Sequence, residues 1–313
     1  MNGKLYNGAA TPYGDRTFII INPHAGQDSP CKLRRLLGGA FAARGASFDI
    51  VETQRPGHAT DLARMAAERG YRAVCIVGGD GTLAEVAAGL AGSDVPLAII
   101  PRGTANQVAH NLQIPTELEA AVDVAVNGVA TPLDLGRVNG RAFALIAGAG
   151  YDAAVMAAAT RPLKERWGFG AYVYAALKQA VSATPVDFEI VADGQEIRVR
   201  AVTVMLANMG ELFADFIPFG LPLAPETARS WQDGLLDILI VAPRNLPEFA
   251  AVLWRAARRQ FAGDDRLIHL QAREVSIRSE PQIAVQVDGD ACGTTPVHAY
   301  IQHHGLKVLV PAR

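Results

Sequence analysis

Four apolar segments alternate with four helical patterns in the first 135 residues, and this alternation limits the fold more than any other feature of the chain. Each apolar segment ends at a proline, a glycine or a polar turn. Strands separated by helices pair in parallel, and the helices then cover both faces of the sheet. The expected strands are 17–23, 47–53, 73–77 and 96–101, and the expected helices are 31–45, 58–70, one from about Leu83 and one from Thr104.

The second part of the chain is dominated by strand patterns. They cover 186–208, with a turn at Asp193-Gly194, and also 234–242, 274–279 and 283–290, with helical stretches at 164–181 and 246–263. We therefore expect an α/β N-terminal domain with a parallel sheet and a β-rich, sandwich-like C-terminal domain. The expected boundaries are a flexible tail 1–16, an α/β domain 17–132, a linker near 131–136, a β-rich domain 133–300, and a segment 301–313 that packs back on the first domain.

Charge and cysteine content exclude several classes of protein. The formal net charge of −2 argues against nucleic acid as the main partner, because proteins that bind nucleic acid are usually basic. The three cysteines are far apart and form no CxxC pair, which favours neither a zinc site nor a disulfide framework, and Cys75 is expected in the core. The N-terminus has no apolar signal region, and no apolar run of spanning length occurs. We expect a cytoplasmic protein.

The stretch "VGGDGTLAEV", from Val77 to Val86, lies between an expected strand and an expected helix. Its glycines allow positive φ angles and close approach of a ligand, and the free N–H groups of a helix N-terminus bind anions. The stretch has no lysine and fits neither a Walker A loop nor GxGxxG. A tight structural turn is the alternative, with Thr82 and Glu85 at the spacing of a capping box.

A second helix start is expected in "IIPRGTANQVA", from Ile99 to Ala109. Thr104 and Gln107 repeat the capping-box spacing. Both helix starts would lie at the carboxyl edge of one sheet, where they could hold a polyphosphate between them. Arg102 would supply the positive charge that the first loop lacks, unless it is an ordinary solvated arginine.

Three further stretches carry polar residues at strand ends. In "INPHAG", Asn22 either binds a ligand or braces its loop, and His24 is expected on the loop surface without a catalytic role. Thr53 ends the second strand. In "QVDGDACG", Asp288 and Asp290 flank a glycine. They indicate either a hairpin turn or a pair of carboxylates for a general base or a metal ligand.

These five motifs, "NPHAG", "TQRPGHA", "GGDGTLAE", "PRGTANQVA" and "DGD", resemble in order and type those of the bacterial lipid kinases related to diacylglycerol kinase, with sphingosine kinase as a eukaryotic relative. The resemblance covers about residues 17–311. It implies an N-terminal domain like that of NAD kinases and phosphofructokinases, which binds ATP, and a C-terminal domain that supports lipid binding. GGDGT alone would also admit NAD kinases and phosphofructokinases.

The resemblance also implies roles for individual residues. The family's general base falls on Asp290, with Asp288 beside it, and Asp80 would organise the Mg²⁺-bound phosphates. A structural Mg²⁺ would be held by the Asp233 side chain and the carbonyls of Ser230 and Leu235, unless Asp233-Gly234 is only a turn. The nucleotide would be lined by Asn22, Pro23, His24, Ala25, Gly26, Thr53, Gly79, Asp80, Gly81, Thr82, Leu83, Ala84, Glu85 and Thr104.

We therefore expect an ATP- and Mg²⁺-dependent kinase that phosphorylates a lipid hydroxyl of diacylglycerol-like, sphingoid or phosphatidylglycerol type. It would contact the inner face of the membrane transiently, through 166–174 and 211–223 unless these are core, and a homodimer is left open. Two residues depart from the family pattern: Gln107 stands in place of aspartate, and Asp290 in place of glutamate. The alternatives are a kinase of soluble substrates like NAD kinase and a degenerate lipid- or nucleotide-binding protein without turnover.

Overall fold

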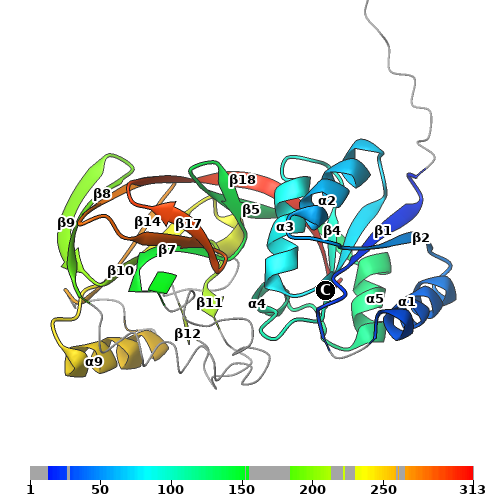
Figure 1. Ribbon diagram of the computed structural model, residues 1–313, viewed down its shortest axis with the longest axis horizontal. Helices are drawn as coiled ribbons and strands as arrows, with labels where there is room; N and C mark the ends of the chain where they lie inside the picture. The colour runs from blue at the N-terminus through cyan, green and yellow to red at the C-terminus, as the bar shows by residue number, and fades with distance from the viewer. Residues whose placement is uncertain are drawn as a thin grey trace, which may run out of the picture.

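The computed structural model describes residues 13–26, 29–151, 153–154, 184–212, 221–222, 230–258, 260 and 265–312. An α/β part and a β-rich part lie side by side (Figure 1), as expected from the sequence. The long strands β5 (Val129–Val138) and β18 (Val297–Val310) run from one part into the other.

The α/β part is built on four parallel strands in the order β2 (Ser47–Glu52), β1 (Arg16–Ile21), β3 (Ala73–Gly78) and β4 (Leu97–Pro101). All four were predicted. Its helices are α1 (Pro30–Ala43), α2 (His58–Glu68), α3 (Asp80–Leu90), α4 (Gln107–Asn111) and α5 (Leu118–Asn127). The helix expected from Thr104 begins three residues later, as the short α4, and α5 was not predicted as a separate helix.

Alternate residues of each parallel strand pack on opposite faces of this sheet. In β1, Ile19 and Ile21 belong to the core beneath α1 and α5, whereas Phe18 and Ile20 belong to the core beneath α2 and α3. Cys75 on β3 is fully buried, as predicted. Because helices cover both faces, polar side chains that bind a ligand are left to the carboxyl edge of the strands.

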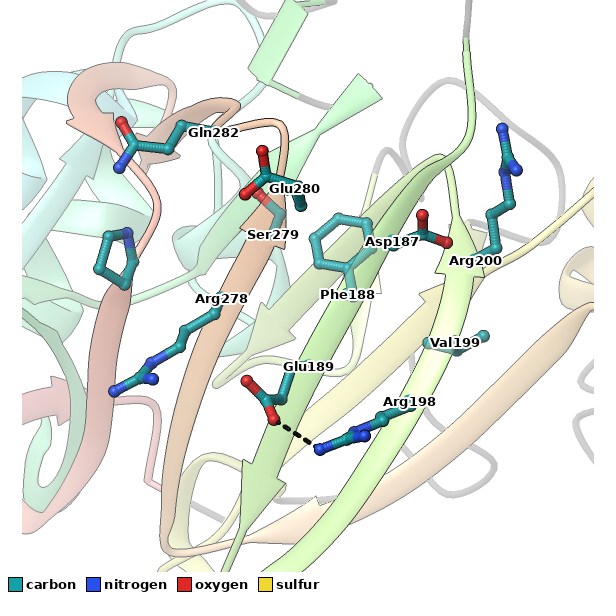
Figure 2. A pocket seen from close by; sticks show the side chains of 11 residues that line it. Asp187, Phe188, Glu189, Arg198, Val199, Arg200, Arg278, Ser279, Glu280 and Gln282 are labelled. Carbon is teal, nitrogen blue, oxygen red and sulfur yellow. Dashed lines mark hydrogen bonds and ion pairs between the residues drawn. The ribbon is translucent and has the colours of Figure 1, made fainter.

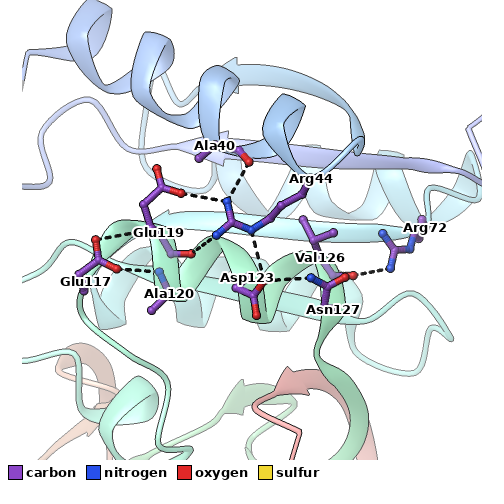
Figure 3. A network of polar contacts seen from close by, with 9 residues as sticks. All are labelled: Ala40, Arg44, Arg72, Glu117, Glu119, Ala120, Asp123, Val126 and Asn127. Atoms are coloured by element: carbon purple, nitrogen blue, oxygen red, sulfur yellow. Dashed lines mark hydrogen bonds and ion pairs between the residues drawn. The ribbon is translucent and has the colours of Figure 1, made fainter.

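Arg44, which follows α1, ties that helix to α5 (Figure 3). Its guanidinium donates to the Glu119 carboxylate at 2.9 Å, to the Glu119 carbonyl at 2.8 Å and to Asp123 at 3.3 Å. Glu117 in turn accepts from the first N–H groups of α5. These contacts fix α1 and α5 together on one face of the sheet.

The β-rich part is a sandwich of two sheets. One sheet has the order β14 (Leu267–Ala272), β13 (Leu236–Val241), β10 (Thr203–Ala207), β7 (Ile146–Gly150), β16 (Ala284–Val287) and β17 (Asp290–Thr294). The other continues from β18 through β15 (Glu274–Glu280), β8 (Val186–Ala192) and β9 (Gln195–Ala201), and β6 (Arg141–Phe143) pairs with β5. Apolar side chains of both sheets form one core between them.

Strand β18 joins the two parts into one sheet. It runs parallel to β4, with Val308 opposite Leu97, and antiparallel to β5 and β15. Residues 131–136, where we expected a linker, lie inside β5 instead, because β18 gives that segment a strand partner. Tyr13, within the segment expected to be flexible, stacks on Tyr71 with ring centroids 4.6 Å apart.

The remaining described elements are β11 (Glu211–Leu212), β12 (Leu221–Pro222), the 3-10 helix η1 (Ser230–Gln232) and α9 (Leu246–Ala257). Segment 166–174, and all of 211–223 except β11 and β12, lie outside the described residues, so their expected role as a lipid or membrane contact stays a prediction. In the described part of the chain, no helix is long and apolar enough to span a bilayer.

Candidate functional site

The loops that follow β3 and β4 touch at two glycines. A Cβ added to Gly79 would lie 2.9 Å from the Cα of Gly103, and one added to Gly103 would lie 2.5 Å from the Cα of Gly79. Real Cβ atoms do not approach that closely, so only glycine allows this contact. The Arg102 N–H also donates to the Gly78 carbonyl at 2.8 Å. The two helix starts expected to cooperate are therefore adjacent.

The loop after β1 joins the same edge of the sheet. Asn22 Nδ2 donates to Thr82 Oγ1 at 2.8 Å, and Asn22 Oδ1 accepts from the His24 N–H at 3.0 Å. Gly26 has a φ of +78° and packs against the backbone of Arg102. The Thr53 N–H donates to the Ile21 carbonyl. The predicted positions from the first three strand ends thus gather around the start of α3.

The capping box expected between Thr82 and Glu85 does not form. Helix α3 begins at Asp80, so its cap position is Gly79, which has no side chain, and Thr82 lies inside the helix, where its Oγ1 accepts from Asn22. Glu85 Oε2 instead accepts from the Ala59 N–H at the start of α2, at 3.1 Å. Glu85 therefore stabilises the N-terminus of α2, where the chain lacks any other side-chain cap. Its place in the nucleotide lining stays a prediction.

Leu83 also has a structural role. Its side chain is 3% exposed and packs in the core shared by α2 and α3, so a contact of Leu83 with a nucleotide, which stays a prediction, would come from its backbone. A leucine one turn into a helix that covers a sheet points toward the strands. Of its neighbours in the motif, Ala84 is partly buried and Gly81 is exposed.

The second expected capping box is also absent. Helix α4 begins at Gln107, and its cap position is Asn106, which has a φ of +46°. Asn106 holds the turn closed because its side chain accepts from the Gly103 N–H at 2.8 Å and donates to the Gly103 carbonyl at 3.0 Å. The buried Gln107 donates to the Ala105 carbonyl. Thr104 is exposed. Asn106 was missed, although an asparagine between a Gly-Thr turn and a helix is a usual signal for such a cap.

Asp80 is the first residue of α3, and its side chain reaches the first turn of α4. Its Oδ1 accepts from the Val108 N–H in the first turn of α4 at 3.2 Å. Burial raises the pKa of Asp80, although backbone N–H groups at Gln107 and Val108 oppose the shift. The acid in the glycine loop therefore has a structural partner as well as a place at the sheet edge.

Asp288 is both a turn residue and a recessed carboxylate. It and Gly289 have φ angles of +47° and +88° and close the hairpin between β16 and β17. Its carboxylate accepts from the N–H groups of Ala144 at 2.9 Å, Leu145 at 3.1 Å and Ile146 at 2.9 Å. Burial raises the pKa of Asp288 to about 6, and the charge of Asp80 adds to the rise. The motif therefore forms the expected hairpin turn, and the fold brings Asp288 within electrostatic reach of Asp80.

Asp290 lies apart from this pair. Its carboxylate is 71% exposed and accepts from Arg141 of β6 at 2.8 Å. Asp288 lies in the two-residue turn, whereas Asp290 begins β17 opposite Val287, so the two side chains do not meet as a carboxylate pair. Arg141 was not anticipated, because no motif marks it.

Arg102 has a buried hydrogen-bond donor that is not satisfied within the described part of the chain. Its Nε atom is buried and has no partner among the described residues. A buried guanidinium nitrogen without an acceptor is costly unless a ligand supplies one. The sequence left Arg102 open between a phosphate contact and a solvated residue, and this burial favours the first.

The predicted structural metal residues lie in a second acidic region. Asp233 Oδ1 accepts from the Leu235 N–H at 2.9 Å, just after η1, which begins at Ser230. Partial burial raises the pKa of Asp233, and the charges of Asp237 and Asp134 raise it further. Asp134, which is fully buried on β5, was not predicted because no local pattern distinguishes it.

An open groove lies elsewhere, on the strands β8, β9 and β15 (Figure 2). Its volume is about 800 Å³, and it is lined by side chains of both signs, among them Arg198, which pairs with Glu189. None of the predicted site residues borders this groove. We do not associate it with the site at the edge of the parallel sheet.

Comparison with known proteins points to one family. Residues 16–138 match the diacylglycerol kinase catalytic domain, and residues 146–310 match the YegS C-terminal NAD kinase beta sandwich-like domain. The chain is 31% identical over 299 residues to a diacylglycerol kinase of Bacillus subtilis (strain 168), covering 95% of this chain and 96% of that protein. It is 28% identical over 298 residues to one of Staphylococcus carnosus (strain TM300), covering 95% of each.

A solved structure agrees with these sequence matches. A protein of Bacillus anthracis str. Sterne, described as a diacylglycerol kinase, superposes with a TM-score of 0.78 at 25% identity. The match covers 95% of this chain and 97% of that one. The similarity therefore extends through both parts of the fold.

The raised pKa of Asp288 has a consequence for stability. The folded state moves this pKa from 3.8 to about 6, so between these values the folded chain binds the proton more tightly than the unfolded chain. The contribution to stability is therefore present at low pH and is lost as the pH rises through about 6. We expect acidification through this range to stabilise the wild type more than Asp288→Asn, measured by denaturant unfolding with a chelator present. Equal responses of the two proteins would contradict the assignment.

Proposed function

Since this chain belongs to the diacylglycerol kinase catalytic-domain family of lipid kinases, we propose that it transfers the γ-phosphoryl group of ATP to the hydroxyl of a membrane lipid. The relatives named diacylglycerol kinase favour a diacylglycerol-like acceptor, with sphingoid lipids and phosphatidylglycerol as further candidates. The observation that most supports this proposal is the glycine contact between the loops after β3 and β4, beside the unpaired Arg102 Nε.

The residues at this edge fit a nucleotide. The start of α3 offers free N–H groups, and Gly79 and Gly103 leave no side chain between the two loops. Arg102 would supply a charged donor to a phosphate oxygen. Asn22, Thr53, Thr82 and Thr104 would complete the contacts, with the loop from Pro23 to Gly26 beside them. Bound Mg²⁺·ATP would supply the phosphoryl group and the divalent charge that offsets its oxygens.

The residues also fit a divalent cation. Asp80 and Asp288 both have raised pKa values, and the charge of one adds to the shift of the other. Two carboxylates that resist ionisation together are stabilised when a cation is near. Gln107 carries no charge, and its amide is used within its own loop, so Asp80 and Asp288 provide the negative charge here. Ser230, Asp233 and Leu235 remain the proposed holders of a separate structural Mg²⁺.

We assign the proton transfer to Asp290. A general base must reach the substrate hydroxyl within about 3 Å, directly or through one water. Asp290 is exposed and can do so, whereas the Asp288 carboxylate is occupied by three backbone N–H groups. The contact with Arg141 would hold Asp290 in one orientation before the lipid arrives. Asp288 would then position the segment Ala144–Ile146 and the hairpin.

The proposal is tested with purified full-length protein, γ-labelled ATP, Mg²⁺ and vesicles that carry one candidate lipid at a time. We expect label in a single lipid class, which mass spectrometry of the product identifies. NAD as acceptor is the soluble control. Label on NAD with none on any lipid would overturn the lipid assignment, and no transfer at all with intact ATP binding would indicate a binding protein without turnover.

The role of Asp290 is tested in the same assay. Asp290→Asn should lower kcat by about 10²–10⁴-fold, the usual contribution of a general base. Asp265→Asn is a matched control, because Asp265 is also exposed and paired with an arginine. We expect that control to keep the wild-type rate. An unchanged rate for Asp290→Asn with a large loss for Asp288→Asn would move the base to Asp288.

A kinase with a lipid substrate must contact the membrane. We propose that α9 makes this contact, with the inner face of the bilayer. Trp254 on α9 is 61% exposed, more than any other large apolar side chain in the described residues. The guanidinium of Arg258 lies 4.4 Å from the centre of its ring. Tryptophan and arginine together suit the boundary between lipid tails and anionic head groups.

Trp254→Ala should reduce sedimentation with phosphatidylglycerol vesicles and raise the apparent KM for lipid in them. Activity on a short-chain, water-soluble lipid should stay at the wild-type level, because the change is far from the chemistry. Tyr300→Ala is the control, since Tyr300 is an exposed aromatic residue on β18. Equal vesicle binding by both variants and the wild type would rule out this surface.

A further inference from the structure

Two neighbouring histidines in β18 depart from ordinary strand geometry. The pairing of β18 with β5 shifts register between Gln302 and Leu306, and His304 within this bulge has a φ of +52°. Successive side chains of a strand normally point to opposite faces. Here the rings of His303 and His304 stack instead, with centroids 3.7 Å apart and an angle of 28° between their planes. The bulge therefore brings both imidazoles to one side of the strand.

Both histidines meet a buried carboxylate. Asp134 on β5 has no exposed surface, and its Oδ1 lies 2.9 Å from Nδ1 of His303. Its oxygens also accept from the backbone N–H groups of His304 at 2.6 Å and Gly234 at 2.8 Å. Three segments of the chain, β5, the turn after η1 and the bulge of β18, thus fix this carboxylate in place.

The region carries more negative charge than its fixed cations offset. No lysine or arginine in the described part of the chain pairs with Asp134. A second carboxylate, that of Asp233, belongs to the adjoining turn, where the N–H of the next residue, Gly234, donates to Asp134. A buried carboxylate in such surroundings is stabilised by a cation, supplied either by a protonated histidine or by a metal ion.

We propose that Asp134, His303 and His304 form a binding site for a divalent transition metal of the Zn²⁺ type. One carboxylate oxygen of Asp134 and one ring nitrogen of each histidine lie within 4.8 Å of one another. Zinc bonds of about 2.0–2.2 Å require tetrahedral ligand atoms roughly 3.4 Å apart, so the two imidazole rings would turn out of their stacked arrangement to bind the metal. His303 is 52% exposed, so the fourth position is open to water.

The donor atoms distinguish this site from a magnesium site. Imidazole nitrogens favour zinc, copper, nickel or iron, whereas Mg²⁺ prefers oxygen ligands. The nearby Ser230, Asp233 and Leu235 offer only oxygen atoms. The two sites therefore differ in the metal they select, and the zinc-type site does not depend on the kinase assignment.

The metal would brace the backbone that supports Asp288. The Asp134 carbonyl accepts from Asn208 Nδ2 at 2.7 Å, and the same amide donates to the Ala144 carbonyl at 2.9 Å. The Ala144 N–H donates to Asp288. Loading the site should therefore raise the melting temperature, since a ligand that binds only the folded state stabilises it.

The test uses the full chain, stripped with a chelator and dialysed against Zn²⁺ or Co²⁺ with excess Mg²⁺ present. We expect one equivalent of metal by elemental analysis, visible absorption of Co²⁺ in a tetrahedral nitrogen–oxygen site, and a higher melting temperature. His304→Asn is the main variant, because asparagine tolerates a positive φ and removes only the imidazole. It should weaken metal binding by more than about 10-fold, as should His303→Gln.

His298→Asn is the matched control, since His298 is an exposed histidine of the same strand and lies outside the cluster. It should bind metal like the wild type. Absence of stoichiometric Zn²⁺ and Co²⁺ binding by the wild type would overturn the proposal and leave only the contact between His303 and Asp134. Wild-type affinity in both His303→Gln and His304→Asn would overturn it as well.

Discussion

The hydrogen bonds that β18 makes along both edges hold the two parts of this chain in one sheet. One edge pairs with β5, and the other pairs with β15 and then with β4. Strand β5 leads into β6, and β6 packs against α3. The pairing of β18 with β5 therefore fixes the position of Ala144, Leu145 and Ile146, which follow β6, relative to the loop before α3. Asp288 binds those three N–H groups, so its distance from Asp80 follows from the register of a strand at the far end of the chain.

The chemistry of the site depends on backbone groups more than on charged side chains. Gly79 and Gly103 bring two loops together, α3 presents its first N–H groups, and Asn22 and Asn106 close the turns around them. Burial raises the pKa values of Asp80 and Asp288, and the proposed divalent cation would offset their charges at this edge. Such a site suits phosphoryl transfer, where positioning and charge compensation provide most of the catalysis.

The sequence was most informative where a pattern is local and periodic. The parallel strands and the Asp193-Gly194 and Asp288-Gly289 turns were predicted, because apolar periodicity and turn residues act within a few positions. Neither capping box forms, because α3 begins at Asp80 and α4 at Gln107, so Thr82 and Thr104 are not at cap positions. Thr82 and Glu85 contact Asn22 and Ala59 instead, which no local spacing records. Two features could not be predicted from spacing: Asp80 and Asp288 lie within electrostatic reach of each other, and Asp134 contacts the histidines of β18. Both features depend on strand pairing between distant segments.

The position of β18 in the chain has a consequence for synthesis on the ribosome. Until residues 297–310 have emerged, β4 has an unpaired edge and β5 pairs only with β6. The N-terminal helices can cover their sheet early, but that sheet cannot be completed before β18 has been synthesised. Assembly of the site is therefore delayed until the segments that hold Asp80 and Asp288 have both been synthesised. Until then the open edge of β4 is exposed to pairing with other chains.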